Sequence, residues 1–361
     1  MNEQLLKYEE KVLFNLRDLY RKHGYLPYQM SKFEEYELYI RNKEFMVSDR
    51  VIAFNDTNGK MMALKPDVTL SIIKSGEDVA GVKQKVYYNE NVYRVSQSTH
   101  RFKEIMQAGL ECIGDTDLYD IFEVISLAAQ SLASIRENFV LTVSHLGILN
   151  TVVDSLCEDG RFKKQAFDFI SEKNEHDLKR LCEEFGIEEN GYSTLCRLIH
   201  AYGERSSVLE SLKTIPAVGN TEELEQLSAL LDTSPYSKQI QFDFSLVSDN
   251  NYYNGFIFKG FLYGIANDIL SGGQYDKMME KMHRRSHAVG FALYLDTLEQ
   301  LAPTKQGYDV DFLVLYDATV PCAVVAEKTA DLIAKGFTCS AQKGKPDKLR
   351  CKEIIDLRKE G

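Results

Sequence analysis

The sequence lacks the cysteine spacing that zinc sites and disulfide frameworks need. Its 361 residues include seven cysteines, an odd number, and no two of them stand in a C-x-x-C arrangement. They are Cys112, Cys157, Cys182, Cys196, Cys322, Cys339 and Cys351. Because both kinds of site have recognisable cysteine spacings, we predict reduced thiols, no metal and a cytoplasmic location.

Long apolar runs are absent, and prolines are few. No stretch approaches the ~18 apolar residues of a membrane span, and Met1–Lys7 lacks the basic-then-apolar layout of a signal peptide. The seven prolines are too few for long proline-rich linkers. The hydrophobic fraction of 44% and the charged fraction of 27% are typical of a globular protein. We therefore expect no association with a membrane.

Positive charge is in deficit, and the familiar nucleotide and metal motifs are missing. The 43 Lys and Arg residues against 54 Asp and Glu residues give a net charge of −11, which argues against non-specific nucleic-acid binding. The sequence contains no G-x-x-x-x-G-K-[ST], G-x-G-x-x-G or H-E-x-x-H. His283 and His287 are four residues apart, but their polar surroundings favour a solvated loop over a metal site. We predict no cofactor.

The length and the order of elements predict two units of the α+β class. At ~100–200 residues per domain, 361 residues suggest two domains. Strand patterns dominate the first third, and a helical block at about 151–235 interrupts a later set of strands, which is not regular βαβ alternation. We predict a core over 1–302 and a small α/β segment over 308–361. In that segment, 310–316 reads as a strand and 322–335 as a helix.

The most informative segment is a pair of strands predicted within Val86–Ile113. On the second strand, Gln107, Gly109 and Glu111 alternate with apolar residues, so one face is polar around a glycine. A core strand does not need such a face, whereas a strand that floors a ligand site does. A glycine there would let a ligand approach the backbone. The alternative is that Gln107 and Glu111 are merely solvated.

Five segments, in this order, carry a resemblance to class II aminoacyl-tRNA synthetases, specifically to the histidyl branch. They are Leu64–Thr69, the strand–loop–strand Val86–Gly114, Tyr252–Phe258, the G-G-Q-Y-D stretch Gly272–Asp276, and Val289–Ala292. The second resembles motif 2 of that class, and the last resembles the opening of motif 3. The resemblance covers about 1–300. It implies an antiparallel sheet core with a helical insertion, followed by a truncated α/β C-terminal segment.

The resemblance also implies a site for histidine. By this resemblance, Asp67, Thr69 and Gln107 would hold the α-amino group of the ligand. Glu111 and Tyr253 would contact its imidazole. A carboxylate accepts and a phenol donates, and together they match the two nitrogens of an imidazole ring.

The departures from the synthetase pattern concern its cationic residues. By resemblance, Arg94 would face the α-phosphate of ATP as a vestige of that site. Ser248, Thr297 and Gln274 stand where the pattern has arginines, and Ser31 stands where motif 1 has its proline. Loss of one donor to a developing negative charge typically costs ~3–4 kcal/mol of transition-state stabilisation. Serine and threonine cannot replace a bidentate cation. We therefore predict no catalytic residues.

A synthetase-like chain that keeps histidine-type contacts and loses these arginines resembles the regulatory subunits of ATP phosphoribosyltransferase. That resemblance implies a non-catalytic role in the first step of histidine biosynthesis and in feedback regulation by histidine. The implied partners are a short-form catalytic subunit and a second copy of the chain, with no tRNA. Two alternatives stay open: a divergent histidyl-tRNA synthetase, and a synthetase-like ligase that acts on another amino acid or carrier.

Overall fold

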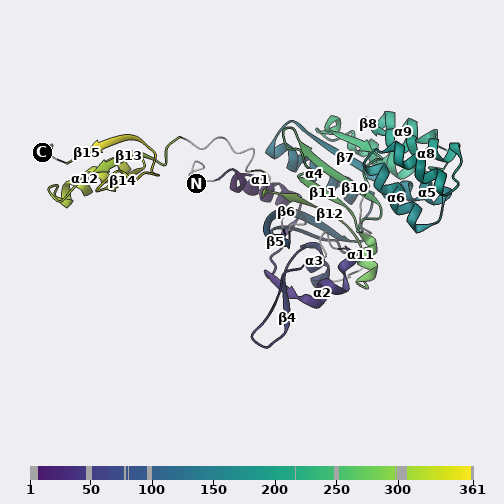
Figure 1. The fold of residues 1–361 in the computed structure, drawn as a ribbon, viewed down its shortest axis with the longest axis horizontal. Helices are drawn as coiled ribbons and strands as arrows, with labels where there is room; N and C mark the ends of the chain where they lie inside the picture. Colours follow the sequence, from purple (N-terminus) through teal and green to yellow (C-terminus); the bar gives the residue numbers. More distant parts are fainter. Residues whose placement is uncertain are drawn as a thin grey trace. The chain divides into compact units, whose positions relative to one another are not determined.

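Figure 1 shows the fold of the chain in a computed structural model. It describes residues 7–45, 51–76, 79, 81–95, 100–215, 217–247, 252–296, 298 and 307–358. The chain divides into two compact units, Met1–Gln300 and Leu301–Gly361, which are described separately.

A nine-stranded sheet forms the centre of the first unit. Its order is β1 (Leu26–Pro27), β5 (Gln84–Val95), β6 (Phe102–Gly114), β12 (His287–Tyr294), β11 (Leu270–Gln274), β10 (Phe256–Leu262), β7 (Phe139–His145), β9 (Ile240–Asp243) and β8 (Tyr202–Gly203). From β5 through β7 every neighbouring pair is antiparallel, and β1 and β9 add to this block as parallel strands. This arrangement confirms the predicted α+β class.

Two helices, α1 (Tyr8–Lys22) and α4 (Leu118–Ile135), cover one face of this sheet. Tyr20 of α1 packs against Tyr87 of β5 and Phe291 of β12, and its hydroxyl lies 3.0 Å from the Ser131 hydroxyl of α4. Helix α4 is long and apolar enough to cross a membrane, yet 61% of it is buried inside the structure. Packing against β10 and β12 is the behaviour of a core helix.

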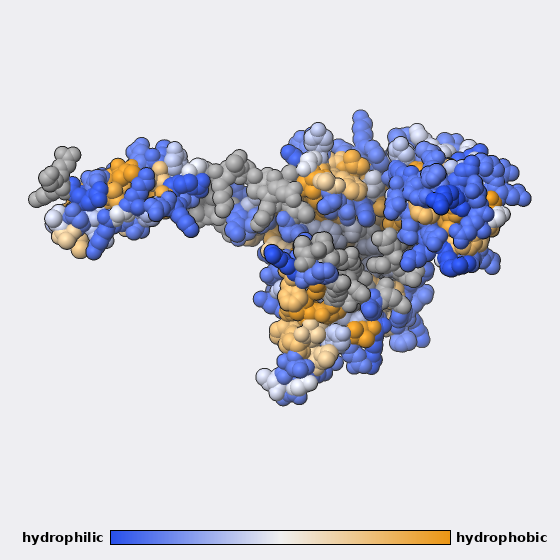
Figure 2. Space-filling view, viewed as in Figure 1, coloured by the Kyte–Doolittle hydropathy of each residue, from blue (hydrophilic) through white to orange (hydrophobic). Residues whose placement is uncertain are grey.

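A smaller sheet and three short helices lie on the other face. The sheet has the order β2 (Phe33–Glu35), β4 (Met61–Leu64), β3 (Ala53–Asn55), and the helices are α2 (Tyr36–Arg41), α3 (Thr69–Ser75) and α11 (Asp276–Lys281). Tyr39, Leu70, Val92 and Met278 belong to the buried apolar cluster that joins these elements to the large sheet. Apolar side chains also gather on the outer surface above the β3–β4 turn, as Figure 2 shows.

The predicted helical block is confirmed, and it begins earlier than expected. It comprises α5 (Leu146–Leu156), α6 (Gly160–Ser171), α7 (Glu175–Glu184), α8 (Glu189–His200), α9 (Arg205–Lys213) and α10 (Glu222–Leu231) (Figure 1). Arg205 at the start of α9 is 6% exposed, and its guanidinium donates to the carbonyl oxygens of Ser237 and Ile240 at 2.5 and 2.7 Å. The block is thereby tied to the beginning of β9.

The second unit is a three-stranded parallel sheet with one helix. Its strands have the order β14 (Cys339–Gln342), β13 (Val310–Leu315), β15 (Cys351–Asp356), and α12 (Cys322–Ala334) follows β13 in the chain. The strand and the helix predicted from the sequence are both present. Gly336 adopts a φ of +85°, and the amide of Phe337 donates back to the carbonyl of Leu332, which ends the helix as expected for a glycine cap.

Candidate functional site

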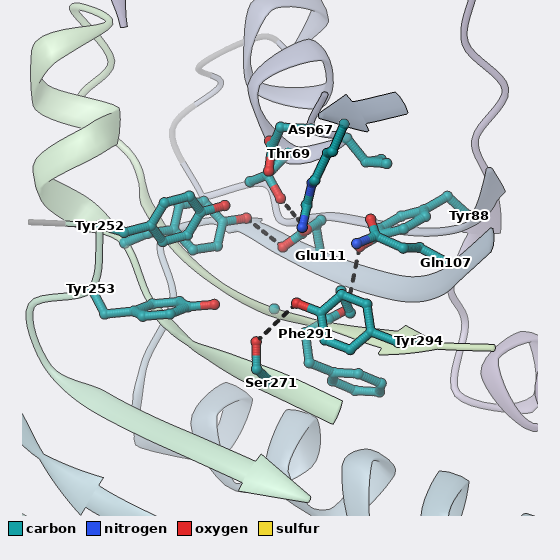
Figure 3. A pocket seen from close by; sticks show the side chains of 15 residues that line it. Asp67, Thr69, Tyr88, Gln107, Glu111, Tyr252, Tyr253, Ser271, Phe291 and Tyr294 are labelled. Carbon is teal, nitrogen blue, oxygen red and sulfur yellow. Dashed lines mark hydrogen bonds between the residues drawn. The ribbon is translucent and has the colours of Figure 1, made fainter. Parts of the chain in front are cut away.

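One cavity gathers all six residues that the sequence singled out. Asp67, Thr69, Arg94, Gln107, Glu111 and Tyr253 line a space of about 110 Å³ on the face of the large sheet opposite α1 and α4 (Figure 3). A buried water needs only ~10–15 Å³ measured in this way, so the cavity has room for a small polar molecule. These residues come from the start of α3, from β5 and β6, and from the segment before β10.

Three glycines on neighbouring strands lie under side chains of the site, and one of them, Gly290, lines the cavity itself. A Cβ at Gly273 would lie 2.8 Å from the ring of Tyr253, and one at Gly290 would lie 1.7 Å from Oε2 of Glu111. At Gly109 it would lie 2.5 Å from the hydroxyl of Tyr88. The prediction that Gly109 admits a ligand to the backbone is therefore wrong, because the Tyr88 ring occupies that space. The glycines instead let large polar side chains lie low on the sheet.

Glu111 is the central acidic group of the cavity. Its side chain is 2% exposed, and each carboxylate oxygen accepts one hydrogen bond, from Thr69 Oγ1 at 2.9 Å and from the Tyr275 hydroxyl at 2.6 Å. The pKa of Glu111 is raised to about 8. Burial is the main cause and nearby Asp67 adds to it, while the hydrogen bonds from Tyr275 and Thr69 lower the pKa. At pH 7 the unliganded cavity therefore holds Glu111 mainly in its neutral form.

Asp67 and Thr69 are placed by the first turn of α3. Asp67 Oδ1 accepts a hydrogen bond from the amide of Leu70 at 3.0 Å, and this cap holds the carboxylate at the helix start. Asp67 is 8% exposed, and burial raises its pKa against the opposing effects of the Leu70 amide and the Arg94 charge. Two buried carboxyl groups thus face a small cavity. They favour a ligand that brings positive charge or hydrogen-bond donors.

Arg94 is the one cationic side chain among the described residues that line this cavity. Its Nε donates to the carbonyl oxygen of Pro66 at 3.0 Å, which fixes the guanidinium beside the Asp67 segment. A half-buried guanidinium in this position suits the carboxylate of an amino acid as well as a phosphate.

Tyrosines supply much of the remaining wall. Four of them had no role predicted from the sequence: Tyr88, Tyr252, Tyr275 and Tyr294. The Tyr252 ring packs edge to face against Tyr253, with ring centroids 4.7 Å apart, and at a tilt against Tyr275, with centroids 5.9 Å apart. Burial raises the pKa of these three phenols well above 10, so they stay neutral and can donate hydrogen bonds. Tyr275 belongs to a segment that the resemblance includes, yet its contact with Glu111 follows from tertiary structure.

Of the three positions where arginines are missing, the structure describes Gln274. Gln274 lies against Gly255, and its Oε1 accepts a hydrogen bond from the amide of Phe256 at 2.7 Å, so it serves the local backbone. Ser248 and Thr297 lie outside the described residues. Within the described part of the chain, no group of three His, Cys, Asp or Glu side chains is placed to hold a metal ion.

The antiparallel sheet and its polar cavity define the class of the protein. This is the fold of the class II aminoacyl-tRNA synthetases, as the structural neighbours show. Within that class, the family model for histidyl-tRNA synthetase matches residues 1–298, so the chain belongs to the histidyl-tRNA synthetase family.

Relatives and solved structures agree with this placement. An ATP phosphoribosyltransferase regulatory subunit from Alkaliphilus metalliredigens is 26% identical over 290 residues, which cover 77% of this chain and 73% of the relative. A solved structure from Bacillus halodurans C, described as an ATP phosphoribosyltransferase regulatory subunit/histidyl-tRNA synthetase, has a TM-score of 0.77 at 21% identity and covers 98% and 94% of the two chains. A chain of an ATP phosphoribosyl transferase (HisG:HisZ) complex from Thermotoga maritima has a TM-score of 0.64 at 20% identity, covering 80% and 97%. At these identities the solved structures show the fold, and the names confirm the resemblance that the sequence predicted.

Proposed function

We propose that the chain is a non-catalytic regulatory subunit of ATP phosphoribosyltransferase, which acts in the first step of histidine biosynthesis and in its feedback regulation by histidine. One observation carries the proposal. The cavity keeps, around Glu111, a lining suited to bind a free amino acid. Serine, threonine and glutamine stand where a synthetase has arginines. The names of the curated relatives support the same role.

Free histidine matches the chemistry of the cavity. Its α-ammonium group suits the buried carboxyl of Asp67 and the side chains of Thr69 and Gln107, and its imidazole suits Glu111 and the Tyr253 phenol. With the imidazole at Glu111, the carboxylate of histidine is left to face the guanidinium of Arg94. Each charged group of a zwitterion then has an opposite partner, which is what a buried charge requires.

Activation of that histidine by ATP is not expected of this chain. Formation of an aminoacyl-adenylate builds negative charge on the α-phosphate, and fixed guanidinium groups stabilise it. Arg94 alone remains among the described cavity residues, and its Nε is already used by Pro66. The arginines missing at Ser248 and Thr297, at ~3–4 kcal/mol each, would alone slow the reaction by roughly 10⁴-fold or more.

Regulation needs surfaces for a catalytic subunit and for self-association. The Thermotoga maritima structure is of a complex, and we infer that this chain likewise assembles with a short-form catalytic subunit. We also infer a homodimer. Phe33 and Phe54 of the small sheet are 48% and 40% exposed, and they pack edge to face with ring centroids 5.7 Å apart. Exposed apolar clusters of this kind mark protein interfaces.

The alternative that a specific observation favours is a divergent histidyl-tRNA synthetase, because the family model that matches is named for that enzyme. The two functions differ in chemistry. A synthetase exchanges pyrophosphate with ATP in the presence of histidine, and a regulatory subunit does not.

The test is a mixing experiment with the short-form ATP phosphoribosyltransferase of the same organism. The catalytic subunit alone is expected to be weakly active, to gain activity with this chain, and then to be inhibited by histidine. Size-exclusion chromatography in parallel measures whether the two proteins co-elute. Allosteric coupling is typically 1–3 kcal/mol, so histidine is expected to change the affinity between the subunits about 5–150-fold, and the partner must change histidine affinity by the same factor. Absence of co-elution and of any rate change would sink the proposal. Robust histidine-dependent pyrophosphate exchange would favour the synthetase.

A further inference from the structure

The floor of the cavity is built from small residues until it reaches Tyr294. Gly290, Ala292 and Tyr294 lie on the same face of β12, because alternate residues of a strand point the same way. Ser271 of β11 pairs with Ala292 and continues the small-residue floor on the next strand. The Tyr294 hydroxyl then lies 3.4 Å from the Ser271 hydroxyl. The large ring of Tyr294 thus stands at the end of a floor that otherwise consists of small side chains.

Tyr294 marks the end of the cavity that is remote from Glu111. In the pairing of β12 with β6, Glu111 lies opposite Gly290 and Gln107 lies opposite Tyr294. The two pairs are four residues apart, which is ~13 Å along a strand. A ligand that places one end at Glu111 and extends along β12 past Gln107 therefore meets the Tyr294 ring.

A second phenol, that of Tyr253, lies next to the Tyr294 ring. Figure 3 shows Tyr253 and Tyr294 pointing toward one another over Ser271, on the side of the site away from Asp67 and Thr69. The Ser271 hydroxyl and Tyr294 both influence the pKa of the buried Tyr253 phenol, which places the three side chains in one group. We call Ser271 and Tyr294, whose hydroxyls lie 3.4 Å apart, the tyrosine gate.

We propose that Tyr294 of the tyrosine gate sets the size of the ligand, so that the cavity accepts a free α-amino acid and excludes one that carries a bulky group on its carboxylate, such as an aminoacyl-adenylate. This inference rests on the proposed function, in which histidine lies with its imidazole at Glu111. The backbone atoms of histidine then lie on the Gln107 side of Glu111, with the carboxylate at Arg94. A bulky group attached to the carboxylate and extending along β12 has to pass the phenol ring of Tyr294. The gate, together with the side chains that cover the glycines, limits the cavity to about 110 Å³.

The test compares L-histidine with a stable histidyl-adenylate mimic, in which a sulfamoyl group replaces the phosphate. Titration calorimetry is carried out on the full chain as wild type, Tyr294→Ala and Tyr294→Phe. Wild type and Tyr294→Phe, which keeps the ring, are expected to bind the mimic at least about tenfold more weakly than histidine. Tyr294→Ala is expected to bind histidine within a few-fold of wild type and to bind the mimic at least about tenfold more tightly than wild type does, since one methylene alone discriminates ~10–200-fold.

The outcomes separate this inference from the function on which it rests. If wild type binds the mimic as tightly as histidine, or if Tyr294→Ala gains nothing for the mimic while it still binds histidine, the size gate is wrong and the effector assignment stands. If no form of the chain binds histidine, the effector assignment fails and the gate fails with it. Should Tyr294→Ala not fold, Tyr294→Val removes the ring while keeping a side chain suited to a strand.

Discussion

The replacement of Glu111 by glutamine is expected to change the pH dependence of stability. In the unfolded chain a glutamate has a pKa near 4.5, whereas in the folded chain burial raises that of Glu111 to about 8. Between these values the folded state binds more protons than the unfolded state, so the contribution of Glu111 to stability falls as the pH rises from about 4.5 to about 8. Below that window its contribution is fully present, and above it the loss is complete.

The size of the effect follows from the same two values. A difference of about 3.5 pH units at 1.36 kcal/mol each gives ~5 kcal/mol, which is an upper bound because water entry relieves part of the cost of burying a charge. Glutamine has the shape of the neutral acid and accepts from and donates to the hydroxyls of Thr69 and Tyr275. Glu111→Gln is therefore expected to match wild type at pH 5 and to exceed it by several kcal/mol at pH 8.5.

The assay is urea unfolding of wild type and Glu111→Gln at half-unit steps from pH 5 to pH 9, without ligand. The difference between the two curves reports Glu111 together with its coupling to nearby Asp67, since groups that do not interact with Glu111 titrate alike in both proteins and cancel. Glu184→Gln on the exposed side of α7 is the matched control and is expected to show no such rise. If the stabilities of wild type and Glu111→Gln run parallel across the whole pH range, the folded protein stabilises the ionised carboxylate of Glu111 as well as water does. That result would refute the reasoning.

Three further predictions concern binding, the helical block and self-association. Tyr253→Phe removes one hydrogen-bond partner of the proposed imidazole site. Calorimetry is expected to show histidine binding weakened by about 1–3 kcal/mol, or roughly 5–150-fold. Unchanged affinity in a folded variant would place the histidine site elsewhere. Arg205→Met leaves the carbonyl oxygens of Ser237 and Ile240, at the start of β9, without their donor. It is expected to lower the free energy of unfolding, measured with urea, by about 2–6 kcal/mol. The exposed Arg161→Met is the control, and an equal loss in both variants would contradict this role of Arg205. Phe54→Ser removes part of the exposed apolar cluster and is expected to shift sedimentation toward the monomer at micromolar concentration, whereas an unaltered dimer would remove this surface from the proposed interface.

Much of the fold and of the site could be predicted from local pattern. The alternation of Gln107, Gly109 and Glu111 with apolar residues placed the polar face of β6 correctly, because the period of a strand is set by its own backbone. The helical block and the elements of the second unit were likewise predicted from periodicity. The six residues carried over by resemblance meet in one cavity. Their roles in binding stay a prediction.

What the sequence could not supply is the pairing of residues that are far apart in the chain. Glu111 receives its hydrogen bonds from Thr69 and Tyr275, which are 42 and 164 residues away, so its neutral state depends on the meeting of three segments. The register of β5 on β6 sets Tyr88 over Gly109 and overturned the expectation of an open backbone there. The register of β12 on β6 likewise sets Tyr294 opposite Gln107. Local pattern determined which side chains are polar and on which face they lie, because strand and helix periods are properties of a short stretch of chain. Only the tertiary structure decided which of them touch, how deeply they are buried and hence which are charged, because register and desolvation depend on the whole packed sheet.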